Sequence, residues 1–118
     1  MVVKEHFAII IPKSYPLEAA GPVMCAGITT YDPLVKLGAE KGGKRIGIVG
    51  LGGLGVMGVK LAKALGNEVT VISRAPKKAE FAKKCGADSF VVSTDAEQMK
   101  AAENSLDLIL NTVRSPYA

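Results

Sequence analysis

Three glycines in the segment GIVGLGGLGVMG have the spacing of a dinucleotide-binding fingerprint. Gly50, Gly52 and Gly55 fit the pattern G-x-G-x-x-G, with a short apolar run before them and an apolar helical pattern after them. In such a turn the first glycine permits the bend, the second admits a diphosphate, and the third lets helix and strand pack closely. A plain tight turn is the alternative, but it needs one or two glycines, and each surplus one costs about 0.5–1 kcal/mol. The pattern therefore favours dinucleotide binding.

The end of the next strand predicts which dinucleotide is bound. An NAD site usually presents an acidic residue to the ribose hydroxyls about 20 residues beyond the glycines. This chain has Ser73 and Arg74 there and no acid. A guanidinium can pair with a 2′-phosphate and stack on adenine, and Lys77 or Lys78 can add positive charge. An ordinary surface arginine is the alternative; the missing acid favours NADP(H).

These residues require a framework of alternating strands and helices, which the hydrophobic pattern predicts from residue 45 onward. We expect helices where apolar residues repeat at three- and four-residue intervals, as at Leu54, Met57, Leu61 and Leu65, with Gly66 as a C-terminal cap. Strands alternating with such helices form βαβ units, so the fold class is α/β with a Rossmann-like parallel sheet. The expected strands are 45–50, 68–73, 88–93 and 106–113, and the expected helices are 54–65, 75–86 and 94–105, the last capped by Thr94 or Asp95.

The first 44 residues predict a separate, mainly helical lead-in. The apolar run FAIIIP at 7–12 is typical of a strand. Beyond it, helix-forming residues are interrupted by Pro22 and Pro33, which favours two short helices over one long one. We therefore divide the chain into residues 1–44, a strand and helices, and residues 45–118, a partial nucleotide-binding domain.

Composition excludes several other classes of protein. Of the 118 residues, 48% are hydrophobic and 22% are charged, which favours a folded domain over disorder. No apolar run is long enough for a membrane span or a secretory signal, so we expect a cytoplasmic protein. The net charge is +4, but the lysines are scattered and aromatic residues make up only 5%, so nucleic acid is not an expected partner. Two cysteines, Cys25 and Cys85, and one histidine, His6, do not suffice for a self-contained zinc site in this chain.

Three longer segments carry a resemblance to a known family. AAGPVMCAGITTYDPL, GKRIGIVGLGGLGVMGVKLAKALGNEVTVISR and KCGADSFVVS resemble the cinnamyl-alcohol-dehydrogenase branch of the zinc-dependent, medium-chain alcohol dehydrogenases, and the similarity runs from about Phe7 to Thr112. The resemblance implies an NADP(H)-dependent, zinc-dependent enzyme that interconverts primary alcohols and aldehydes.

The same resemblance implies roles for individual residues. Cys25 matches the third ligand of the catalytic zinc, and Thr29 matches a threonine beside the nicotinamide. Cys85 and His6 match no functional position. The remaining matches are the pyrophosphate loop (Gly50, Leu51, Gly52, Gly53, Leu54, Gly55), the 2′-phosphate pocket (Ser73, Arg74, Lys78) and a further cofactor contact (Thr112).

Parts that the family possesses have no counterpart in this sequence. The first two zinc ligands, the substrate domain and the last two strands of a six-stranded, doubly wound sheet are not matched, and those strands usually make the family's dimer contact. We therefore expect the cofactor-binding segment of a homodimeric parent enzyme, not catalytically competent by itself. A stand-alone, non-catalytic NADP(H)-binding module or a truncated gene product is the alternative. A methyltransferase-like protein is disfavoured, because that class typically keeps an acid where Ser73 and Arg74 stand.

Overall fold

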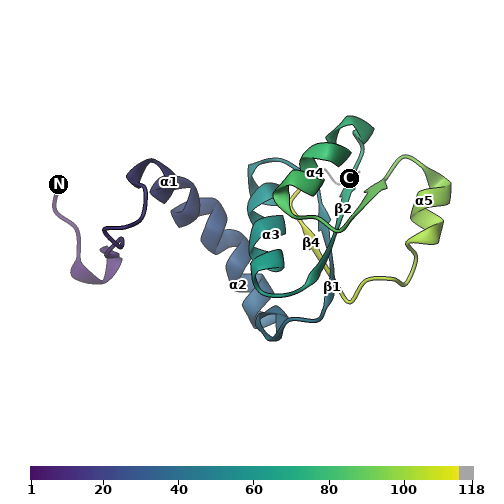
Figure 1. Cartoon of the computed structure of the whole chain (residues 1–118). Helices are drawn as coiled ribbons and strands as arrows, with labels where there is room; N and C mark the ends of the chain where they lie inside the picture. Colours follow the sequence, from purple (N-terminus) through teal and green to yellow (C-terminus); the bar gives the residue numbers. More distant parts are fainter. Residues whose placement is uncertain (115–118) are drawn as a thin grey trace.

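A sheet of four parallel strands in the order β3-β2-β1-β4 forms the centre of the molecule (Figure 1). The computed structural model describes residues 1–114. The chain runs from β1 outward through β2 to β3 and then crosses to the other side of β1, which is the strand order of a doubly wound fold. The α/β class and the parallel sheet predicted from the sequence are confirmed. The strands are β1 (Arg45–Val49), β2 (Glu68–Ser73), β3 (Ser89–Val92) and β4 (Leu108–Asn111).

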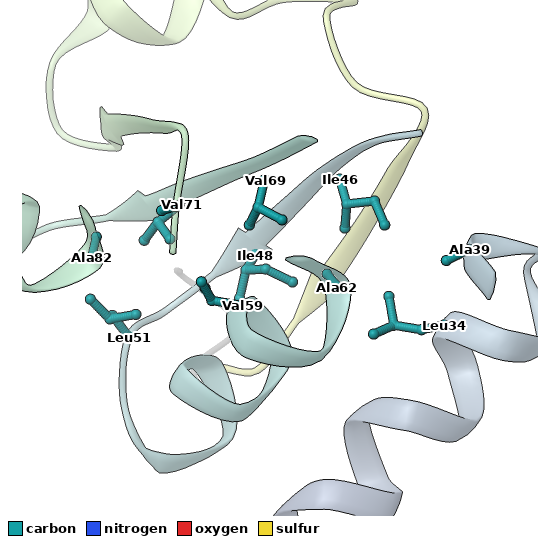
Figure 2. Close-up of a cluster of buried hydrophobic side chains, with 11 residues drawn as sticks. Leu34, Ala39, Ile46, Ile48, Leu51, Val59, Ala62, Val69, Val71 and Ala82 are labelled. Carbon is teal, nitrogen blue, oxygen red and sulfur yellow. The ribbon is translucent and has the colours of Figure 1, made fainter. Parts of the chain in front are cut away.

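Helices α3 (Gly53–Ala64) and α4 (Ala79–Cys85) lie on one side of the sheet, and α5 (Ala96–Ala101) lies on the other (Figure 1). A short 3-10 turn, Pro76–Lys78, precedes α4. The core lies between the sheet and the helices α3 and α4 (Figure 2). Its fully buried members include Ile46 and Ile48 from β1, Val69 and Val71 from β2, Val59 and Ala62 from α3, and Ala82 from α4.

The face that α3 turns to the sheet consists of small residues. Gly55, Gly58, Val59 and Ala62 are the buried positions of this helix. The leucine and methionine positions that gave the helical pattern are half-buried or exposed: Leu54 is 37% exposed, and Met57 and Leu61 face the N-terminal helices. α3 thus packs against two partners, the sheet through its small residues and the N-terminal helices through bulky ones.

Local signals marked the C-terminal ends of α3 and α4 and the N-terminal cap of α5, whereas α5 ends at Ala101, before the predicted residue 105. Gly66 and Gly86 follow α3 and α4 with φ angles of +85° and +107°, conformations that favour glycine at a helix C-terminus. Of the two candidate caps for α5, Asp95 is the one used, since its carboxylate accepts hydrogen bonds from the amides of Glu97 and Gln98.

The N-terminal part differs from the prediction. Residues 7–12 do not form a strand, and Ile9 and Ile10 are 69% and 94% exposed. The two prolines do not separate two helices: α1 (Leu17–Pro22), a π-helical turn η2 (Val23–Gly27) and α2 (Ile28–Lys36) form one helical run, with Pro33 inside α2. Across residues 1–114, no helix has the length and apolar character needed to span a membrane.

Candidate functional site

A cleft of about 550 Å³ lies where the carboxyl ends of the strands meet. Its walls come from residues at or just after each strand: Gly50 follows β1, Ser73 ends β2, Ser93 follows β3 and Thr112 follows β4. In open α/β sheets, ligands bind in this crevice at the point where the strand order reverses. Here that point lies between β1 and β4.

Two glycines of the loop after β1 are required by the protein's own packing. Gly50 has a φ of +89°, and a Cβ there would lie 2.5 Å from Cγ2 of Val113. A Cβ on Gly55 would collide with the carbonyl oxygen of Gly50. The bend after β1 and the close contact of α3 with this bend thus each depend on a missing side chain.

Gly52 has no such packing requirement. Its φ of −102° and ψ of −161° are open to any residue, and a Cβ there would meet no atom within 4 Å. Gly52 nevertheless lines the cleft. A glycine that the fold does not need fits a backbone that a ligand approaches closely.

The N-terminus of α3 offers hydrogen-bond donors beside this loop. The first intrahelical bond runs from the amide of Val56 to the carbonyl of Gly52 at 2.9 Å, so the amides of Gly53, Leu54 and Gly55 have no acceptor within the helix. The N-cap residue is Gly52, which has no side chain that could accept a hydrogen bond from them. These amides and the positive end of the dipole of α3 suit an anion.

The cleft lining contains three cationic side chains, Arg74, Lys78 and Arg114, and no Asp or Glu among the described residues. The Lys78 ammonium donates to the carbonyl of Leu51 at 3.2 Å, which places its charge at the glycine loop. Arg74 is exposed at the end of β2. The cleft therefore has a positive potential that favours a polyanionic ligand.

Thr112 connects the end of β4 to the glycine loop. Its hydroxyl donates to the carbonyl of Val49 at 2.8 Å, and its amide donates to the same carbonyl at 3.0 Å. The hydroxyl proton is thus used within the protein, and only the oxygen's free lone pair is open to a ligand.

Cys25 and Thr29 do not line this cleft. Cys25 is exposed in the π-helical turn η2, and Thr29 follows in α2 with its hydroxyl donating to the Cys25 carbonyl at 2.7 Å. Thr30 donates in the same way to the carbonyls of Ala26 and Gly27. These hydroxyls give carbonyls within the wide turn an additional hydrogen bond, the usual way in which a threonine in a helix bonds back to the preceding turn.

The described residues do not fit a zinc ion by themselves. Within residues 1–114, no three His, Cys, Asp or Glu side chains are grouped closely enough to hold a metal ion. Tetrahedral zinc sites take three or four protein ligands, and Cys25 would supply one. No reaction step through zinc can be derived from this residue set.

Two further cleft residues, Ser93 and Arg114, were missed from the sequence. Ser93 comes after β3 and Arg114 after β4, as Arg74 comes after β2, and this shared position was the available signal. The residues that were predicted from the sequence and that the structure does bring together on the cleft are Gly50, Leu51, Gly52, Ser73, Arg74, Lys78 and Thr112.

Comparison with known proteins gives one family and many relatives. Residues 53–118 match the model of the family described as zinc-binding dehydrogenase. A probable mannitol dehydrogenase from Fragaria ananassa is 54% identical over 118 residues, covering 99% of this chain and 33% of the relative. The chain thus spans about a third of the length of the curated relatives it matches.

Solved structures agree with this result. A cinnamyl alcohol dehydrogenase from Sorghum bicolor superposes with a TM-score of 0.90 at 51% identity, over 94% of this chain and 32% of that one. A cinnamyl alcohol dehydrogenase from Helicobacter pylori, complexed with NADP(H), gives a TM-score of 0.77 at 41% identity, over 89% of this chain and 28% of that one.

Proposed function

Because this chain belongs to the zinc-binding dehydrogenase family, we propose that it is the NADP(H)-binding part of an alcohol dehydrogenase or aldehyde reductase. The observation that carries the proposal is the cleft at the switch point of the sheet, which joins an open glycine loop to a lining that, among residues 1–114, contains cations and no acid. The relative from Helicobacter pylori, whose structure contains NADP(H), supports the choice of cofactor.

Each element of the cleft has a part in holding the cofactor. The glycine loop and the first amides of α3 bind the diphosphate, and Gly52 leaves room for it. Ser73, Arg74 and Lys78 bind the 2′-phosphate at the end of β2. Thr112 keeps the loop against the end of β4. When bound, NADP(H) supplies or accepts a hydride at its nicotinamide ring.

The activity of a whole enzyme is part of the proposal. The relatives are named for different alcohols, mannitol and cinnamyl alcohol among them, so we propose only a primary alcohol or aldehyde as substrate. Cys25 would serve as one zinc ligand and Thr29 as a contact near the nicotinamide, both on elements outside the cleft. We expect such an enzyme to be a cytoplasmic homodimer.

A stand-alone NADP(H)-binding module is the second candidate. It is favoured by one observation, that residues 1–114 form a cofactor cleft without grouping the ligands for a metal. Zinc analysis and alcohol oxidation on the purified chain separate the two candidates. We expect neither zinc nor turnover from this chain alone, and turnover with bound zinc would contradict that expectation.

Replacement of Arg74 tests the choice of cofactor. We expect Arg74→Gln to weaken NADPH binding about tenfold, because one charge-assisted contact with the 2′-phosphate is lost, and to leave NADH binding unchanged. Fluorescence titration of each reduced cofactor gives both dissociation constants.

The matched control is Lys77→Gln, which removes a neighbouring charge that does not line the cleft. We expect this variant to bind both cofactors like the unmodified chain. Equal losses for NADPH and NADH in Arg74→Gln would show that Arg74 does not select the cofactor. An unmodified chain that binds neither cofactor would refute the proposed function.

A further inference from the structure

Arg114 approaches the glycine loop from the side opposite to Arg74. Arg74 follows β2 and Arg114 follows β4, and these two strands flank β1, whose end leads into the loop. Because β2 and β4 are the two neighbours of β1, the arginines that follow them lie on either side of the strand that leads into the loop. Both line the same cleft.

The segment before Arg114 is fixed against the loop. Val113 packs on Gly50 so closely that a Cβ at Gly50 would lie 2.5 Å from its Cγ2. The amide of Val113 donates to the Asn111 side chain at 2.9 Å, and Thr112 is held by the Val49 carbonyl. Arg114 therefore leaves the backbone at a defined place beside the loop.

Within residues 1–114, no acidic side chain pairs with Arg114. The Arg114 side chain is exposed. The nearest anion of a dinucleotide in this crevice would be the diphosphate, because the 2′-phosphate lies on the β2 side. A guanidinium binds phosphate oxygens with paired hydrogen bonds.

We propose that Arg114 is a further cofactor-binding residue that binds the diphosphate from the β4 side. The inference rests on the proposed function. It divides the work of the two arginines: Arg74 binds the phosphate that distinguishes NADP(H) from NAD(H), and Arg114 binds the group that both dinucleotides share. Arg114 therefore contributes to affinity without contributing to this selectivity.

Four ligands and two variants test this division. NADPH, NADH and ADP-ribose contain the diphosphate, and adenosine 2′-phosphate does not. We expect Arg114→Gln to weaken the binding of NADPH, NADH and ADP-ribose about tenfold, and the binding of adenosine 2′-phosphate less than twofold. We expect Arg74→Gln to weaken the binding of NADPH and adenosine 2′-phosphate. The binding of NADH and ADP-ribose should stay unchanged. NMR titration of the full chain measures all four dissociation constants, including the weak ones.

Further controls separate the possible failures. Arg114→Lys retains the charge and should recover part of the lost affinity, and matching thermal unfolding curves show that the variants are folded. Unchanged NADH and ADP-ribose binding in Arg114→Gln would overturn the inference while leaving the proposed function intact. A loss limited to ligands with a nicotinamide would also overturn it, because the contact would lie elsewhere. Failure of the unmodified chain to bind any dinucleotide would overturn the proposed function and this inference together.

Discussion

Gly52 and Gly55 belong to one fingerprint but answer to different physical demands. A methyl group at Gly55 would collide with the carbonyl of Gly50, whereas a methyl group at Gly52 would enter open space that belongs to the cleft. Packing requires a glycine at position 55, and room for a ligand requires a glycine at position 52. The two demands separate experimentally, because one concerns folding and the other binding.

We expect Gly55→Ala to lower the free energy of unfolding by about 2–4 kcal/mol, since α3 must move away from the loop. We expect Gly52→Ala to change it by less than about 1 kcal/mol and to abolish NADPH binding. Urea unfolding and fluorescence titration of both variants measure these effects. A folded Gly52→Ala variant that binds NADPH normally would contradict the role assigned to this loop.

Residue types predicted much of the cleft, because polar groups after parallel strands converge at one edge. Gly50, Gly52, Ser73 and Arg74 were found from residue types and spacing and Thr112 from the family resemblance, and the structure places all five on one cleft. Their roles toward a cofactor stay predictions. Arg114 was missed although it directly follows the predicted strand 106–113; in the structure it lines the cleft, next to Val113, which packs on Gly50.

At the level of elements, an exposed ion pair connects the start of β1 to the residue before β4. The carboxylate of Asp107 accepts from the Arg45 amide at 2.9 Å and from Nε and Nη2 of its guanidinium at 3.1 and 2.9 Å. Arg45, first through this side-chain hydrogen bond, lowers the pKa of Asp107 to about 2. Lys63 similarly lowers the pKa of Asp88, whose carboxylate holds the amide of Val69.

These lowered pKa values predict acid sensitivity. An Asp carboxyl binds protons more tightly in the unfolded chain, where its pKa is 3.8, than in the folded protein. The stabilisation by Asp107 is therefore complete above pH 3.8 and is lost as the pH falls toward 2. We expect the free energy of unfolding, measured with urea between pH 6 and pH 2.5, to fall less steeply in Asp107→Asn. An unchanged slope in that variant would contradict the assignment.

Elements were predictable where the local pattern and the tertiary partner agree. β2 was predicted with its observed bounds because its β-branched residues lie between two other strands. The apolar run at 7–12 also contains several β-branched residues, but no strand within the described residues pairs with it. The helical run past Pro22 was not predicted, because a proline inside a helical pattern usually ends the helix, whereas here a π turn follows it.

At the scale of the whole molecule, residues 1–16 project from the end of the helical run, away from the sheet (Figure 1). They account for much of the elongated shape, which measures 54 × 28 × 27 Å. All of their side chains except that of Ile11 are exposed. Their backbone hydrogen bonds are short-range turns such as Phe7 to Lys4 and Tyr15 to Pro12.

This uneven packing predicts an order of hydrogen-exchange protection. Amides of β1 and β2 should exchange slowest, because these central strands are hydrogen-bonded on both sides and carry the fully buried core. Residues 1–16 should exchange fastest, since opening them exposes little additional surface. NADPH should slow exchange across the loop from Gly50 to Val56 and leave residues 1–16 unchanged, because the cofactor acts only on amides at its own site. Exchange monitored by mass spectrometry, with and without NADPH, measures all three regions. Protection of residues 1–16 equal to that of β1 would show that the N-terminal segment folds against the domain in solution.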